Sequence, residues 1–191
     1  LRDQAQGVEL VEGRVGRALR LPDCAQTTAV TFAGPGNLHR PRGSVAFWVR
    51  PTWDGRGDDA RHFIFSLGGF RIYADRARGI ITVMTGTGRL EGWQWSYAPS
   101  APVSDWRAGD WHHVAVTWDG EAQHKALWLD GAQVGEAHSP WIAFRESGHD
   151  FVFGLGWRAP ADYDELAVWD RELSAAEIGR ASCRERECEL V

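Results

Sequence analysis

The stretch "DWHHVAVTWDG", from Asp110 to Gly120, alternates its side chains between two tryptophans. In an extended chain, adjacent side chains point to opposite faces. One face then carries Trp111, His113, Ala115 and Thr117, and the other carries His112, Val114, Val116 and Trp118. The pattern predicts a β-strand whose valine-rich face packs in the core.

The adjacent pair His112 and His113 resembles a catalytic or metal-binding site, because histidine is easily poised for proton transfer or metal ligation. On a strand, however, the two imidazoles point to opposite faces and share no ligand. The seven histidines of the chain also form no H-x-x-x-H or H-E-x-x-H pattern. We therefore expect this pair to be part of the sheet.

Twelve further segments show the period-2 pattern and the β-branched and aromatic residues of strands, separated by Gly, Pro and Asp. They are residues 8–10, 16–22, 28–32, 44–51, 62–67, 70–75, 79–85, 90–98, 124–131, 132–137, 150–156 and 163–170. Asp130-Gly131 lies between two of them and is a strong hairpin signal. No helix of crossover length alternates with these strands, and the one helical signal is the capping box of Ser174 and Glu177. The pattern predicts an all-β fold, a two-sheet antiparallel β-sandwich of the jelly-roll type.

Composition limits the kinds of partner. The 191 residues suit one domain, and the net charge of −5 offers no basic surface for nucleic acid. No apolar run has the length of a membrane-spanning helix, so we expect no membrane insertion. The chain begins with Leu1 and shows no signal segment, which favours a piece of a longer chain.

The end of the chain lacks the strand pattern of the other segments. The stretch "IGRASCRERECELV", from Ile178 to Val191, shows no apolar periodicity and resembles the translated frame of a common sequencing adapter. We interpret residues 1–178 as the domain and residues 179–191 as a non-native or disordered tail that adds nothing to the core. The cysteines, Cys24, Cys183 and Cys188, are too few and too unevenly placed for a disulfide framework.

Four blocks carry a resemblance to a known family. They are "GSVAFWVRPTW" at 43–53, "WHHVAVTWDG" at 111–120, "LWLDGAQVG" at 127–135 and "YDELAVWDRELSAAEI" at 163–178. In this order they resemble the laminin G-like, concanavalin A-like lectin and glucanase jelly rolls, a family related to the pentraxins. The opening strand and turn of that family are missing or degenerate here, which suggests a truncated N-terminal strand. The resemblance implies an extracellular or cell-surface location in a bacterial protein.

The acidic residues Asp162, Asp164 and Glu165 raise two possibilities. Glycosidases of the resembled family carry a Glu-x-Asp-x-Glu pattern, whose positions here are Asp162, Asp164 and Leu166, so both glutamates are absent. The resemblance also implies a structural calcium ion, for which Asp164 is the candidate ligand. The alternative is a solvated carboxylate at a strand end, because one carboxylate cannot supply the six to eight oxygens of a calcium site.

The best candidate for sugar binding is the row Trp93, Trp95 and Tyr97, which would share one strand face. Their rings could stack on a sugar, although a sheet face packed under a neighbouring loop explains the row as well.

Three functions stay open. The preferred one is a non-catalytic binding or adhesion module of a larger extracellular bacterial protein, which recognises carbohydrate or a protein surface. The others are a structural spacer without a ligand and a concanavalin A-like glycoside hydrolase. Fold resemblance alone does not choose among them.

Overall fold

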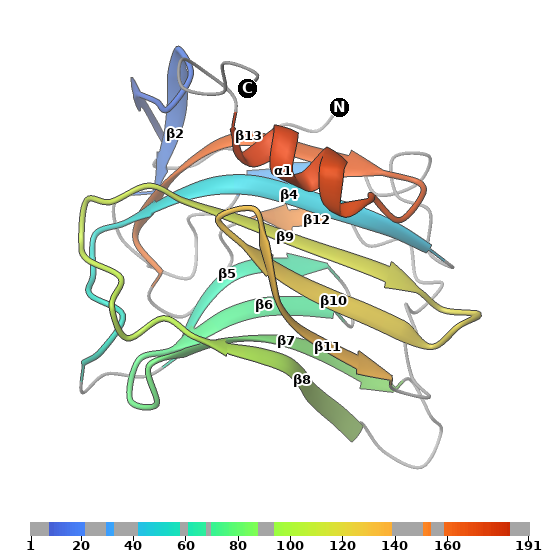
Figure 1. Ribbon diagram of the computed structural model, residues 1–191. Coiled ribbons are helices and arrows are strands. Elements are labelled where there is room, and N and C mark those ends of the chain that lie inside the picture. Colours follow the sequence, from blue (N-terminus) through green and yellow to red (C-terminus); the bar gives the residue numbers. More distant parts are fainter. Residues whose placement is uncertain are drawn as a thin grey trace.

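Two antiparallel β-sheets face each other in the computed structural model (Figure 1), with an apolar core between them. The structure describes residues 8–21, 30–32, 42–57, 61–67, 70–87, 94–138, 151–153 and 159–183. The predicted two-sheet antiparallel sandwich is confirmed, and each of the thirteen predicted segments overlaps a strand. Within the described residues, no helix has the length and apolar character that crossing a bilayer requires.

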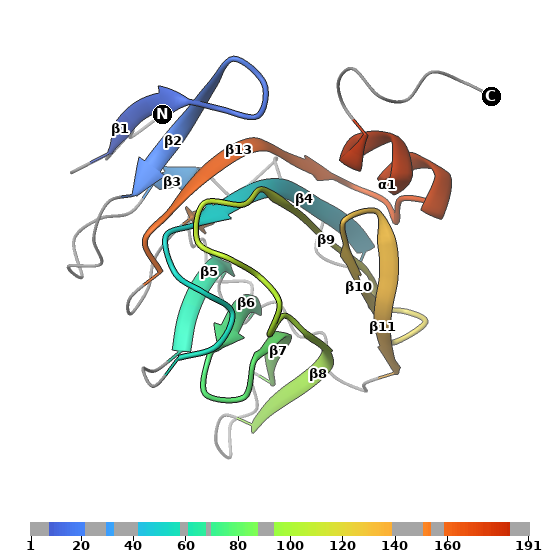
Figure 2. The same cartoon turned by 60° about the vertical axis from the view of Figure 1, so that its left-hand side comes forward.

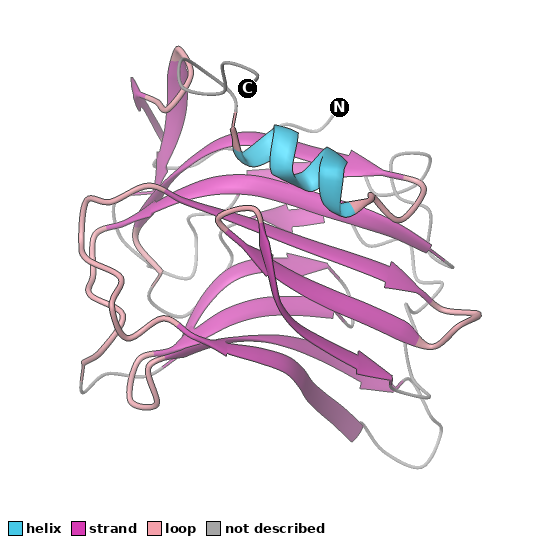
Figure 3. Cartoon of the chain, in the orientation of Figure 1, coloured by secondary structure: helices cyan, strands magenta, loops and turns pink. Residues whose placement is uncertain are grey.

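In the described residues, one sheet has seven strands and the other has six. Figure 3 shows that strands make up most of the fold. The seven-stranded sheet runs in the order β1 (Glu9–Glu12), β2 (Arg17–Leu21), β13 (Ala161–Trp169), β4 (Arg42–Pro51), β9 (His112–Asp119), β10 (His124–Leu129) and β11 (Ala132–His138). The six-stranded sheet runs in the order β3 (Val30–Phe32), β12 (Phe151–Phe153), β5 (Arg61–Leu67), β6 (Phe70–Asp75), β7 (Ile80–Thr87) and β8 (Gln94–Pro102). Strands from the two ends of the chain pair with each other, since β13 lies between β2 and β4.

The core lies between the inner faces of the sheets. In β9 the residues Val114, Val116 and Trp118 belong to it, as the alternation predicts. Phe47 of β4 stacks on Phe65 of β5 with 6.1 Å between ring centroids, so aromatic contacts join the two sheets. Each fully buried large apolar side chain stabilises the fold by about 1.5–3 kcal/mol.

The Asp130-Gly131 hairpin forms as predicted between β10 and β11. Asp130 has φ 49° and Gly131 has φ 82°. Two positive φ angles are typical of the type I′ turn, whose twist matches that of the paired strands.

Lys125 of β10 lies inside the sandwich and is fully buried. Its ammonium donates hydrogen bonds to Thr85 Oγ1 of β7 at 2.8 Å and to Ser96 Oγ of β8 at 3.5 Å. Burial lowers the pKa of Lys125 to about 8. The side chain therefore links the two sheets by polar contacts within the core.

The helix α1 (Ala175–Ser182) lies over β13 and β4 on the outer side of the seven-stranded sheet (Figure 1). Ser174 caps it, because its hydroxyl accepts the Glu177 amide hydrogen while the Glu177 carboxylate accepts the Ser174 amide hydrogen. This confirms the predicted capping box.

The predicted domain end at Ile178 falls inside this helix, and the domain bounds stay a prediction. The helix continues to Ser182 because Ile178 is fully buried against the sheet and the following turn packs beside Gly131. Cys183 at the end of the helix is disulfide-bonded, which sequence reasoning missed. Residues 184–191 lie outside the described residues, and a non-native origin of residues 179–191 stays a prediction.

Figure 2 shows the β1–β2 hairpin at one edge of the seven-stranded sheet and α1 apart from it. The turn of the hairpin lies against Asp164 of β13, whose Oδ2 accepts the Val15 amide hydrogen at 2.9 Å. A Cβ atom at Gly13 would lie 2.5 Å from the same oxygen, so only glycine allows this approach. The strand β1 is thus tied to the fold even though the sequence suggests a truncated N-terminal opening.

Candidate functional site

The outer face of the six-stranded sheet carries an apolar layer that we call the aromatic platform. Its members face away from the core and come from β5, β6, β7 and β8: Phe63, Arg71, Tyr73, Met84, Trp95 and Tyr97. Their neighbours Ile72 and Val83 belong to the core on the inner face. The strand alternation therefore separates the platform from the core.

Trp95 and Tyr97 lie two residues apart on β8, on the same face, as the sequence indicates. Tyr97 is 47% exposed, whereas Trp95 is partly buried against the cluster of Phe63, Tyr73 and Met84. The rings of Tyr73 and Tyr97 meet edge to face with 6.4 Å between centroids. Trp93, the third predicted member, lies outside the described residues.

Sequence reasoning missed Arg71. Its guanidinium carbon lies 5.3 Å from the ring centroid of Phe63 and 5.1 Å from that of Trp95. Burial lowers the pKa of Arg71, yet a guanidinium stays charged at neutral pH. The alternation of "FRIYAD" could have found it, because Arg71 and Tyr73 must share the face opposite Ile72.

The predicted histidine arrangement is confirmed. His112 stacks on Trp106 with ring centroids 4.1 Å apart, and its Nδ1 lies 3.0 Å from Asp130 Oδ2. His113 is buried on the other face, where it meets Trp48 edge on at 5.3 Å. Burial lowers the pKa of His113 to about 4, so its imidazole is neutral at pH 7. The pair makes no shared site.

Asp162 is an ion-pair centre. Its carboxylate is 1% exposed and accepts hydrogen bonds from Arg20 at 2.7 and 2.9 Å and from Arg50 at 2.8 Å. Burial raises the pKa of Asp162, but the two guanidinium groups outweigh burial and hold it below the ordinary 3.8. A carboxylate held ionised in this way cannot donate a proton as a general acid near neutral pH.

Asp164 is buried and not the solvated strand end that the sequence left open. Its two oxygens accept the amide hydrogens of Val15 at 2.9 Å and Glu165 at 2.8 Å. Glu165 has φ 50° in a bulge of β13, so the acidic residues do not form one cluster.

Calcium at Asp164 stays a prediction, and the contacts of the carboxylate argue against it. Both oxygens already face amide hydrogens, whose positive ends disfavour a cation. Among the described residues, no three His, Cys, Asp or Glu side chains lie together in a metal-binding arrangement. The observed role of Asp164 is to hold the β1–β2 hairpin against β13.

We expect Asp164→Ala to lower the free energy of unfolding by about 1–3 kcal/mol, with or without calcium, because the partly buried Val15 amide loses its acceptor. Urea denaturation in calcium and in chelator measures this, with the exposed Asp105→Ala as control. The opposite result is that calcium stabilises the wild type but not Asp164→Ala. The stabilisation is about 2.7 kcal/mol when free calcium is 100 times the dissociation constant. That result would establish a calcium ion at this carboxylate.

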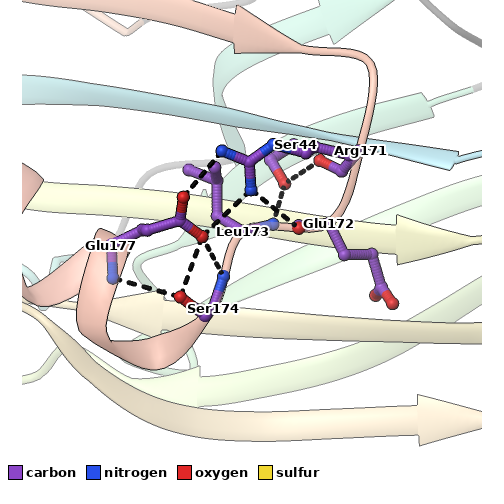
Figure 4. Close-up of polar contacts among 6 residues, drawn as sticks. All are labelled: Ser44, Arg171, Glu172, Leu173, Ser174 and Glu177. Atoms are coloured by element: carbon purple, nitrogen blue, oxygen red, sulfur yellow. Dashed lines mark hydrogen bonds and ion pairs between the residues drawn. The ribbon is translucent and has the colours of Figure 1, made fainter.

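A pocket of about 780 Å³ lies between α1 and the outer face of the seven-stranded sheet. Trp48 Nε1 and His113 Nδ1 are buried in its lining without a hydrogen-bond partner in the described part of the chain. Beside the pocket, Arg171 pairs with Glu177, and the Ser44 hydroxyl bridges the Arg171 carbonyl and the Leu173 amide (Figure 4). The lining includes Gly179, Arg180, Ala181 and Cys183, which belong to the segment predicted as non-native. We therefore assign this pocket no ligand.

A laminin G-type family model, described as the concanavalin A-like lectin/glucanases superfamily, matches residues 25–179. No curated protein matches the sequence.

Solved structures show the same fold at low sequence identity. Domain 4 of AbnA, a GH43 extracellular arabinanase from Geobacillus stearothermophilus in complex with arabinotriose, is 16% identical with a TM-score of 0.70, over 95% of this chain and 84% of that chain. The receptor-binding domain of botulinum neurotoxin type G is 14% identical with a TM-score of 0.64, over 93% of this chain and 44% of that chain. The binding domain of Paraclostridial Mosquitocidal Protein 1 is 13% identical with a TM-score of 0.71, over 93% of this chain and 46% of that chain. The chain thus spans less than half the length of the toxin chains.

Proposed function

Because the chain belongs to the concanavalin A-like lectin/glucanase superfamily, we propose that it is a non-catalytic module that binds carbohydrate on the aromatic platform. The observation that carries the proposal is the exposure of Tyr97, 47% of its surface, above a layer of packed aromatic rings. A flat, rigid ring held by packing offers contact area to a sugar at low conformational cost. Arabinotriose in the similar arabinanase domain supports a sugar ligand.

The non-catalytic assignment is supported by the state of the acidic residues. Asp162 is paired with two arginines, and Asp164 accepts two amide hydrogens. Neither carboxylate is placed to act as a nucleophile or a general acid, the two roles that retaining glycoside hydrolysis needs.

The biological setting of the proposal is a larger extracellular bacterial protein, in which this chain is one module. Two observations support it: the chain covers less than half of the similar toxin chains, and the similar arabinanase is extracellular.

We expect the intact chain to bind a subset of glycans on an array that includes arabinotriose, and Tyr97→Ala to weaken binding about tenfold. Truncating an aromatic anchor at the centre of a contact typically costs this much or more. Isothermal titration with the best array ligand measures the change. Leu10→Ala is the matched control, since Leu10 is also exposed but lies on β1 of the other sheet. A wild-type chain that binds no glycan would favour the structural spacer.

A further inference from the structure

The Arg71 guanidinium is held between two aromatic rings of the platform. Its carbon lies 5.3 Å from the Phe63 centroid and 5.1 Å from the Trp95 centroid. Its Nε is shielded from solvent and has no hydrogen-bond partner within the described ranges. The rings therefore fix the orientation of a cation whose terminal nitrogens stay available at the platform surface.

Arg71 differs in charge balance from three other arginines whose side chains make close contacts. Arg20, Arg50 and Arg171 each pair with a carboxylate. In the part of the chain that the structure describes, no carboxylate lies within ion-pair distance of Arg71. A partly buried cation without a counter-ion is costly, because desolvation of the charge is not offset by an ion pair.

We propose that the ligand of the aromatic platform is an acidic sugar, with its ring against Tyr97 and its carboxylate on the terminal nitrogens of Arg71. The inference rests on the proposed carbohydrate-binding function and names its ligand class. A planar guanidinium matches a carboxylate through two parallel hydrogen bonds, and a fixed guanidinium loses little freedom in making them. The two rings shield part of the guanidinium from water, which strengthens the ion pair. A neutral sugar would cover the cation without neutralising it.

The test uses the intact chain on an array that holds neutral glycans and glycans with uronate or sialate units. We expect the bound glycans to be those that carry a carboxylate. Titrations then compare the best acidic ligand with the same glycan after its carboxylate has been reduced to the alcohol. We expect reduction to weaken binding at least tenfold, the usual loss for a charge-assisted contact.

Arg71→Gln supplies the second arm. This substitution should weaken the affinity for the acidic ligand about tenfold and leave the affinity for the reduced ligand unchanged. It should also remove the salt dependence of binding. Arg71→Lys keeps the charge and should lose less affinity for the acidic ligand. Both variants should retain the thermal midpoint of wild type within a few degrees. If Arg71→Gln unfolds, Arg71→Lys and the reduced ligand still decide the question.

The outcomes separate the two proposals. A wild-type chain that binds neutral glycans as tightly as acidic ones, with Arg71→Gln unaffected, overturns the acidic ligand and leaves carbohydrate binding standing. A chain that binds neither kind overturns both. Acidic binding that depends on Arg71 but not on Tyr97 overturns the placement of the sugar ring against Tyr97.

Discussion

Replacing Asp162 with alanine is expected to lower the free energy of unfolding by about 3 kcal/mol, because one partner of a buried ion pair is removed. The carboxylate is 1% exposed and joins Arg20 of β2 to Arg50 of β4 across β13. Its loss leaves two guanidinium groups facing each other without a counter-ion. They are partly exposed, at 39% and 25%, so water compensates some of the cost and the loss stays near the low end for a buried pair.

Urea denaturation at pH 7 measures this loss, and the exposed Asp105→Ala is the control, expected to change stability by less than about 0.5 kcal/mol. The pH dependence gives a second reading. Because the pKa of Asp162 in the folded chain lies below 3.8, the ion pair stabilises the fold in full above about pH 3.8. This stabilisation is lost as the pH falls through the folded pKa. The wild type and Asp162→Ala should therefore converge in stability below about pH 3.8. A constant difference down to the acid limit would contradict the ion-pair account.

The second large effect concerns Lys125, the only lysine in the sequence. Its folded pKa of about 8 lies below the ordinary 10.5, because burial disfavours the charged ammonium. Between these two values the unfolded chain holds a proton that the folded chain has released, so the free energy of unfolding rises with pH in this window. Below about pH 8 the full cost of the buried charge is present.

We expect this cost to show as a difference between wild type and Lys125→Met, which has no titrating group at the position. From pH 7 to pH 10 the wild type should gain about 2–3 kcal/mol relative to the variant. Denaturation at several pH values measures the gain, and the comparison cancels the titration of tyrosines and the amino terminus. Parallel stability curves for the two proteins would show that Lys125 keeps an ordinary pKa in the folded chain.

Local pattern was enough to predict the strands and their faces. Val114, Val116 and Trp118 face the core because alternation along one strand depends only on neighbouring residues. The Asp130-Gly131 hairpin and the Ser174 capping box were equally readable, since each is completed within a few residues. The end of α1 could not be predicted from local pattern, because the burial of Ile178 and the packing on Gly131 depend on other strands.

The site could be predicted in part. Trp95 and Tyr97 were placed on one face by their spacing on β8, but the ring of Tyr73 beneath them comes from β6. Asp162 and Asp164 looked alike in sequence, and their roles differ because one meets two guanidinium groups while the other meets the β1–β2 turn.

The sequence alone therefore settles the sandwich, its strand faces and its tight turns, because these depend on side-chain alternation and backbone preferences over a few residues. Contacts between distant segments decide the other features of the structure. They determine which carboxylate is neutralised, the burial of Lys125, and the position of Arg71 against Phe63 and Trp95. Those contacts join strands separated by many residues, and their energies depend on burial and charge that exist only once the sheets have packed.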